Sequence, residues 1–171
     1  MQRKRPGLQM KFLVRRATLR DLEALVHQRR GMWEDMGFRG TLLLDEADRA
    51  YRKWAKARLV NGTLVGLIVE TPEHVVAGGG CVWVRPEQPR PQLRGLVVPY
   101  VLSMYTEPEF RRKGVASMIV LEAVKWCKRK GYRRVLLHAS EKGRSLYQKY
   151  GFSRTWEMRL ELPNRRQEPR R

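Results

Sequence analysis

The stretch from Tyr105 to Ser117 constrains the fold of this chain more than any other. Its pattern predicts the end of a strand, a short turn with three consecutive basic residues and a glycine, and then the start of a helix. Apolar residues follow at the spacings of a buried helix: Val115, Ile119, Val120, Ala123, Val124 and Cys127. Basic side chains, free backbone amides and the positive end of a helix dipole therefore converge at one point, where a phosphate would bind.

The remaining periodicity predicts a mixed α/β sheet. Strands are expected at 11–17, 63–70, 75–84, 100–105, 133–139 and 155–162, and helices at 18–30, from about Asp45 to Ala57, from Val115 to a glycine cap at Gly131, and at 142–150. This order contains a single long crossover helix and no repeated doubly wound pattern. Three consecutive glycines, Gly78 to Gly80, fall inside a predicted strand and indicate a bend or the close approach of another element.

The charge of the chain favours anionic partners. The formal net charge is +19, of which the two ends, residues 1–9 and 163–171, carry +3 each, so +13 lies on the body. We expect one domain at 10–162 between two basic tails. A basic body suits a nucleotide-like cofactor, RNA, DNA or acidic proteins, and a solvated basic surface is an equally good interpretation.

Two features bear on the compartment. No apolar run approaches the roughly 20 residues that span a bilayer, and the basic N-terminus lacks the apolar core of a signal peptide, so we expect a cytoplasmic protein with no membrane partner. Cys81 and Cys127 lack metal-ligand spacing. We expect them to be core residues of a reducing compartment, with no disulfide and no metal site.

Two separate stretches resemble the signatures of the GNAT superfamily, the N-acetyltransferases that use acetyl-coenzyme A. Residues 111–116 match Arg/Gln-x-x-Gly-x-Gly/Ala, and residues 146–152 match Leu-Tyr-x-x-x-Gly-Phe. The motifs occur in the expected order, about 30 residues apart. The resemblance implies a GNAT-like fold: a central, mostly antiparallel twisted sheet with a parallel pair at the cofactor cleft and flanking helices.

The resemblance also implies acetyl-CoA as the cofactor and indicates which residues bind it. Backbone amides from about Arg112 to Ser117 would bind the pyrophosphate, because glycine at 114 lets the chain approach an anion closely. The pantetheine arm would pair with the fourth strand like an added strand. The expected cofactor-binding residues are Met104, Tyr105, Thr106, Arg111, Arg112, Lys113, Gly114, Val115, Ala116, Ser117, Ser140 and Arg144.

For catalysis, the resemblance implies that Tyr147 protonates the departing thiolate. Its reference pKa of about 10 is close enough to that of a thiol for this transfer, although Tyr147 could also be purely structural. The predicted strand 100–105 has no carboxylate to act as a base. His138, Glu34 and Asp35 are the candidates for deprotonating the amine, and His138 is our choice because of its reference pKa, although a lone histidine in a strand could also be structural.

The acceptor is less clearly encoded. Trp33, Glu34 and Asp35 lie in a loop between two predicted helices and are the expected substrate-binding residues. The loop's large apolar groups, Trp33 among them, form either a pocket wall or a packing plug. Glu34 and Asp35 could bind a cationic substrate, and a solvated pair is an equally good interpretation. We expect direct transfer to a primary amine of a small molecule or a protein, without a covalent intermediate. A basic nucleic-acid or ribosome-associated binding protein and a catalytically silent acyl-CoA sensor stay open as alternatives. Weak polyanion affinity through the tails and a homodimer are also left open.

Overall fold

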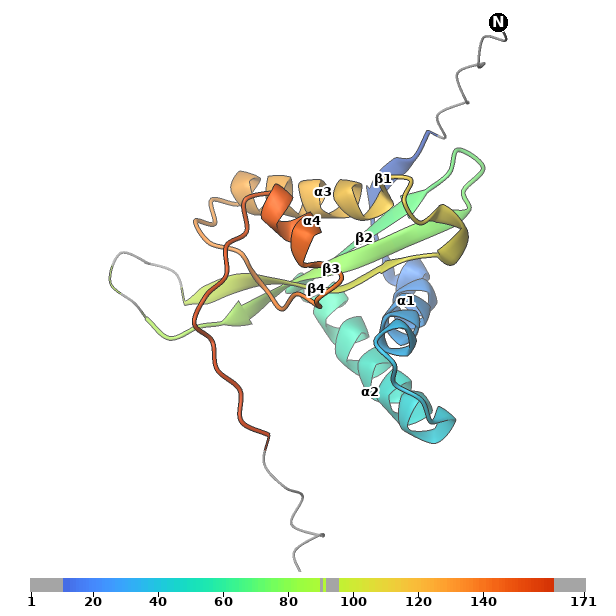
Figure 1. Ribbon diagram of the computed structural model, residues 1–171, viewed down its shortest axis with the longest axis horizontal. Helices are drawn as coiled ribbons and strands as arrows, with labels where there is room; N and C mark the ends of the chain where they lie inside the picture. The colour runs from blue at the N-terminus through green and yellow to red at the C-terminus, as the bar shows by residue number, and fades with distance from the viewer. Residues whose placement is uncertain (1–10, 90, 92–95, 162–171) are drawn as a thin grey trace, which may run out of the picture.

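The computed structural model describes residues 11–89, 91 and 96–161, so both predicted basic tails lie outside the described residues. Five strands form one sheet in the order β1-β2-β3-β4-β5 (Figure 1). The first three pairs are antiparallel and β4–β5 is parallel, which confirms the expected mixed sheet. The strands are β1 (Leu13–Arg16), β2 (Leu64–Glu70), β3 (Val76–Pro86), β4 (Val97–Thr106) and β5 (Leu136–Leu137).

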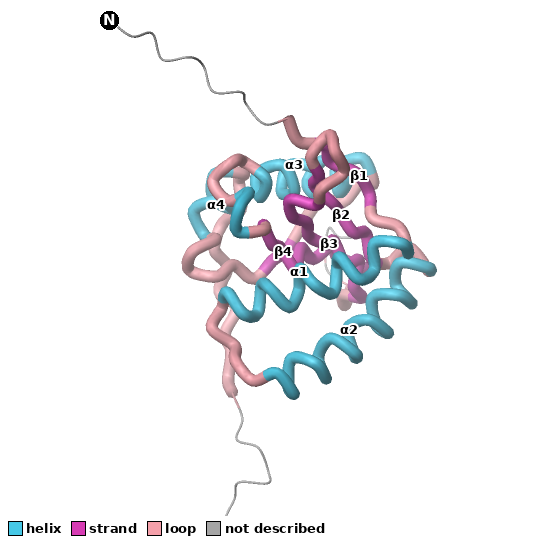
Figure 2. The backbone as a smooth tube through the Cα atoms, turned by 90° about the vertical axis from the view of Figure 1, so that its right-hand side faces the viewer, coloured by secondary structure: helices cyan, strands magenta, loops and turns pink. Residues whose placement is uncertain are grey.

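Helices cover both faces of the sheet. Figure 2 shows α1 and α2 together on one side of the strands and α3 on the other. The helices are α1 (Leu22–Asp35), α2 (Thr41–Val60), α3 (Val115–Arg129) and α4 (Arg144–Lys149), with short 3-10 turns η1 (Leu19–Asp21) and η2 (Pro108–Phe110). Among the described residues, no helix is long and apolar enough to cross a membrane.

Strand β2 divides the core in two. Leu67 and Val69 join the cluster under α3, whereas Leu64 and Ile68 join the cluster under α1 and α2. Alternate side chains of a strand point to opposite faces, so a strand covered on both sides is apolar at nearly every position. This explains the continuous apolar run in its sequence.

The glycine run in β3 permits close packing, as the sequence indicated. A Cβ atom on Gly79 would lie 2.4 Å from Oε1 of Gln28 in α1, and one on Gly78 would lie 2.5 Å from the carbonyl oxygen of Tyr105 in β4. Real Cβ atoms do not approach other atoms so closely. Helix α1 and strand β4 therefore pack directly against the backbone of β3.

The predicted end of the first helix is wrong. Gly31 does not stop α1, because it is a packing residue: a Cβ there would lie 2.6 Å from the Tyr105 ring. The helix runs on to Asp35 and ends in a Schellman motif, in which the Gly37 amide bonds to the carbonyl of Glu34 and the Phe38 amide bonds to that of Trp33. The next helix begins at Thr41, earlier than the expected cap at Asp45.

The strands near the C-terminus are also shorter than predicted. Strand β5 has two residues instead of the expected 133–139. Residues 155–161, part of the predicted final strand, form no strand in the structure, and Leu162 lies outside the described residues. Alternating apolar residues predict a strand only where a partner strand supplies hydrogen bonds, and the described part of the chain pairs nothing with this segment.

Candidate functional site

The N-terminus of α3 presents unused backbone donors. The first intrahelical bond runs from the Met118 amide to the carbonyl of Gly114, at 3.1 Å. Within the described residues, the amides of Val115, Ala116 and Ser117 therefore have no acceptor. Together with the positive end of the helix dipole, these three donors make an anion-binding site.

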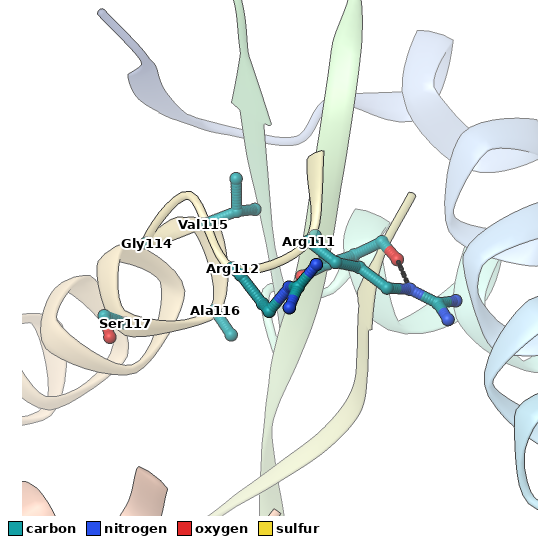
Figure 3. Close-up of a pocket in the computed structure, with 7 residues that line it drawn as sticks. Arg111, Arg112, Gly114, Val115, Ala116 and Ser117 are labelled. Atoms are coloured by element: carbon teal, nitrogen blue, oxygen red, sulfur yellow. Dashed lines mark hydrogen bonds between the residues drawn. The ribbon is translucent and has the colours of Figure 1, made fainter. Parts of the chain in front are cut away.

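The turn before α3 holds this site open through left-handed backbone. Gly114 has φ 88° and ψ 0°, and Arg112 has φ 60°, which is unusual for a residue with a side chain. The turn borders a cleft of about 420 Å³ (Figure 3). The cleft is lined by Thr106, Arg111, Arg112, Gly114, Val115, Ala116 and Ser117, all of them predicted cofactor-binding residues.

Arg111 faces helix α1. Its guanidinium bonds to Asp35 Oδ2 at 2.7 Å and, through Nε, to the carbonyl oxygen of Thr106 at 3.1 Å. Figure 3 shows the side chain directed away from α3. Arg111, which the sequence assigned to the cofactor, and Asp35, which it assigned to the acceptor, thus form one ion pair. Arg112 is the other basic residue that lines the cleft among the described residues.

Strand β4 has a free edge beside this cleft. It pairs with β5 only at Tyr100 and Val101, yet it continues to Thr106. Towards β5, the described residues supply no strand partner for the backbone from Leu102 onwards. An extended ligand can bond to this edge, and no described strand covers it at the predicted pantetheine residues Met104, Tyr105 and Thr106. The carbonyl oxygen of Thr106 accepts from Arg111 Nε.

A bulge shapes the same stretch of β4. Gly79 pairs with Tyr105 and Cys81 pairs with Leu102. Two residues of β4, Ser103 and Met104, therefore lie opposite the single residue of β3 between Gly79 and Cys81. Ser103 is buried and has φ 54°, in the left-handed region. A bulge of this kind bends the strand and redirects its side chains. The sequence carries no signal for it at Ser103.

A second cavity, of about 470 Å³, lies where β5 and α4 meet residues 152–159. It brings together three predicted site residues, His138, Arg144 and Tyr147. Tyr147 is 9% exposed, and burial raises the pKa of its phenol above the usual value. The hydroxyl therefore stays protonated at neutral pH, as a proton donor must.

The Leu-Tyr-x-x-x-Gly-Phe stretch also has a structural role. The rings of Tyr147 and Phe152 meet edge to face at 5.9 Å, and the Phe152 amide bonds to the carbonyl oxygen of Tyr147. Ser140, a predicted cofactor-binding residue, accepts the Gly143 amide through Oγ at 3.2 Å. Ser140 thus shapes the turn that leads into α4, and it is not among the residues that line the described cavity.

The predicted acceptor residues lie on the last turn of α1, not in a loop. The Trp33 ring packs on Phe38 at 4.9 Å, which favours the packing plug over the wall. Glu34 pairs with Arg30 at 3.3 Å, and Asp35 is held by Arg111. None of the three lines the two cavities described above. The structure does not bring them together with Tyr147.

Two polar features at the α1–β4 contact were missed by the sequence analysis. His27 Nε2 lies 3.0 Å from Glu107 Oε1, and its ring meets that of Tyr105 at 6.2 Å. Gln28 is 1% exposed, and its amide has no hydrogen-bond partner among the described residues. Gln28 could have been noticed, since it lies three positions after Leu25 on the inner face of the helix. Nothing in the sequence joins His27 to Glu107.

A family comparison agrees with this geometry. The sequence model of the family described as Acetyltransferase (GNAT) family matches residues 26–152. The match includes most of α1, the turn before α3 and the Tyr147 stretch, whereas residues 153–159, which line part of the second cavity, lie beyond it.

Individual relatives point the same way. A GCN5-related N-acetyltransferase from Ralstonia eutropha JMP134 is 27% identical, with TM-score 0.81 over 89% of this chain and 99% of that one. A predicted acetyltransferase from Clostridium acetobutylicum, solved with acetyl-CoA, is 27% identical, with TM-score 0.79 over 90% and 96%. Glucosamine 6-phosphate N-acetyltransferase from Trypanosoma brucei brucei is 24% identical over 102 residues, 59% of this chain and 67% of that protein.

Proposed function

This chain belongs to the GNAT acetyltransferase family and is an acetyl-CoA-dependent N-acetyltransferase, and from that premise we propose that it acetylates a primary amine of a small molecule by direct transfer. The observation that carries the proposal is the α3 N-terminus, whose three free amides face a cleft beside the unpaired edge of β4. Pyrophosphate would bind to these amides and pantetheine along Met104–Thr106.

The chemistry needs a neutral amine, a thioester and a proton for the leaving group. The amine nitrogen attacks the thioester carbonyl, and the resulting tetrahedral intermediate breaks its C–S bond. The thiolate takes its proton from Tyr147, whose raised pKa keeps the phenol protonated until the thiolate forms. Acetylated amine and coenzyme A are the products, and the enzyme forms no covalent intermediate in this scheme.

His138 is the proposed general base. It lines the same cavity as Tyr147, so one cavity would hold both proton-transfer groups. The two other candidates have less freedom, because Glu34 and Asp35 are each bound to an arginine.

The basic body supports an acceptor that carries an anionic group beside its amine. Glucosamine 6-phosphate is a suitable first compound, because it has both groups and a relative is named for it. A protein amine stays an alternative acceptor. Cytoplasmic location stays a prediction, as does polyanion affinity through the two tails, which lie outside the described residues.

The test has two stages. Thermal unfolding is measured first with coenzyme A at millimolar concentration, where a rise in melting temperature is expected because the ligand binds the folded state. Thiol release from acetyl-CoA is then measured over a panel of amines that includes glucosamine 6-phosphate. Tyr147→Phe should abolish most of the release, whereas Tyr150→Phe, which removes a hydroxyl just after the same helix, should not. Binding without release from any amine would defeat the proposal.

A further inference from the structure

Arg29 occupies an apolar position of α1. Leu22, Leu25 and Val26 precede it and Trp33 follows it at helical spacings, so that all of them lie along one stripe of the helix. Leu25 and Val26 are buried in the core under α1 and α2. A guanidinium in this stripe is directed towards the inside of the molecule, where charged groups are rare unless they are paired.

The contacts of Arg29 are aromatic. Its guanidinium carbon lies 4.7 Å from the centre of the Tyr51 ring in α2 and 5.5 Å from that of the Trp33 ring. Among the described residues, the buried Nη1 atom has no hydrogen-bond partner and no carboxylate forms an ion pair with Arg29. Burial accordingly lowers the pKa of Arg29. The cation is thus half-buried without an anion.

The next residue of the helix shows the contrast with a paired cation. Arg30 is bound by three carboxylates, those of Glu34, Asp45 and Asp48, at 3.3, 2.7 and 2.7 Å. Asp48 also acts electrostatically on Arg29, but its Oδ2 bonds to Arg30 and its buried Oδ1 has no described partner. Because these carboxylates are held by Arg30, an anion that pairs with Arg29 has to come from outside the chain.

The Tyr51 side chain connects Arg29 with the bulge in β4. Tyr51 is 6% exposed, its hydroxyl lies 3.8 Å from Cys81 Sγ in β3, and its side chain interacts with that of Ser103. Ser103 directly precedes Met104, the first of the predicted pantetheine residues. An anion on Arg29 would therefore lie about one tyrosine side chain away from the strand proposed to hold the cofactor. It would lie on the face that α1 and α2 cover (Figure 2).

An unpaired guanidinium in this place lowers the stability of the free protein. Taking a charge out of water costs free energy, and contacts with two aromatic rings offset only part of that cost. Binding sites are where proteins keep such destabilising groups, because the ligand itself satisfies them. Arg29 is partly exposed, so an anion can reach it from solvent.

We propose that Arg29 binds the anionic group of the acceptor and thereby selects amines that carry a carboxylate or a phosphate over their uncharged analogues. This inference rests on the proposed function, because it assigns the acceptor's anion to a residue of that enzyme. The planar guanidinium suits both groups, since each offers two oxygens to its parallel N–H donors. Tyr51 and Trp33 flank the cation and exclude water, which strengthens its attraction for an anion.

The stability of Arg29→Met tests whether the cation is unpaired. Methionine keeps an apolar stem and removes the charge, so the melting temperature of the free protein should equal that of the wild type or exceed it. Arg49→Met, at an exposed position of α2, is the matched control for the loss of one positive charge. A melting temperature that falls in Arg29→Met and not in Arg49→Met would show that the guanidinium stabilises the fold, and the proposal would be wrong.

Inorganic phosphate probes the anion site without any amine. Coenzyme A is added at saturating concentration, so that the α3 amides are occupied. At a phosphate concentration about tenfold above its Kd, the melting temperature of the wild type and of Arg49→Met should rise by about 3–6 °C. The rise should be smaller in Arg29→Met. An equal rise in all three proteins, or a rise in none, contradicts the proposal.

Paired acceptors test the selection itself. Glucosamine 6-phosphate is compared with glucosamine, and β-alanine with ethylamine, because each pair differs in the anionic group. The ratio of kcat/KM within a pair should fall about tenfold in Arg29→Met and stay at the wild-type value in Arg49→Met. The pair with the larger fall identifies the anion as phosphate or carboxylate.

The outcomes separate this inference from the proposed function. Turnover with a ratio that Arg29→Met leaves unchanged overturns the role of Arg29, and the enzyme assignment stands. If no amine of the panel is acetylated, the proposed function fails, and the phosphate measurement still decides whether Arg29 binds an anion.

Discussion

Ser117→Glu should raise the stability of the free protein and lower its affinity for coenzyme A. Ser117 is the third residue of α3, and its amide is one of the three free donors. A carboxylate in the first turn of a helix interacts favourably with the dipole, by about 0.3–1 kcal/mol. For a chain of this size that corresponds to a rise of roughly 1–4 °C in melting temperature.

The same carboxylate opposes a bound pyrophosphate. At a separation of about 6 Å and an effective dielectric constant of about 60, each pair of unit charges repels by about 1 kcal/mol. Two phosphate charges and partial screening by salt leave about 1–2 kcal/mol, which is a five- to thirtyfold weaker affinity. Stability and affinity thus change in opposite directions, which general damage to the fold would not produce.

Thermal unfolding and titration calorimetry with coenzyme A measure the two effects. Lys125→Gln is the matched control, because it changes the net charge by the same amount at an exposed position two turns along α3. It lies about 12 Å further from the helix N-terminus, beyond the screening length at physiological salt. For Lys125→Gln we expect little change in the melting temperature or in the affinity for coenzyme A. An unchanged affinity in Ser117→Glu, with the melting temperature raised, would show that the pyrophosphate binds elsewhere.

Three further predictions follow from single contacts. Tyr147→Phe should lower turnover by about 10²–10⁴ while coenzyme A affinity, measured by calorimetry, stays at the wild-type value. Gly79→Ala should destabilise the fold by about 1–3 kcal/mol in denaturant unfolding, because its Cβ would lie 2.4 Å from Gln28 Oε1; unchanged stability would contradict the packing of α1 on β3. Hydrogen bonds from Arg15 lower the pKa of Asp21 to about 2. The wild type should therefore be more stable than Asp21→Asn by about 1–2 kcal/mol above pH 4, and urea unfolding should show this difference shrinking as pH falls from about 4 towards 2 and vanishing only below that; a difference that is undiminished at pH 2 would exclude the ion pair as its cause.

The anion site was predictable because its parts are close together in the sequence. The basic turn, Gly114 and the first turn of α3 span only a few residues, and local pattern is enough to identify a helix N-terminus. The helix that carries Tyr147 was predictable for a related reason, since α4 and the glycine that closes it form a local unit.

Contacts between distant segments were not predictable in this way. Nothing in the sequence indicates that Asp35 meets Arg111, since 76 residues separate them. Gly31 was interpreted as a helix end because glycine disfavours helices, yet the Tyr105 ring requires glycine at that position. The bulge at Ser103 depends on the glycine-rich strand beside it. Each of these features is set by packing between elements, which overrides the local preference.

The stoichiometry of a single turnover assay tests the central claim most directly. Acetyl-CoA is mixed with the enzyme and an active amine, and free thiol, acetylated amine and the mass of the quenched protein are measured together. Direct transfer predicts one thiol for each acetylated amine and a protein of unchanged mass, with no thiol released when the amine is omitted. Thiol release without acetylated amine, or a protein that carries the acetyl group, would contradict it.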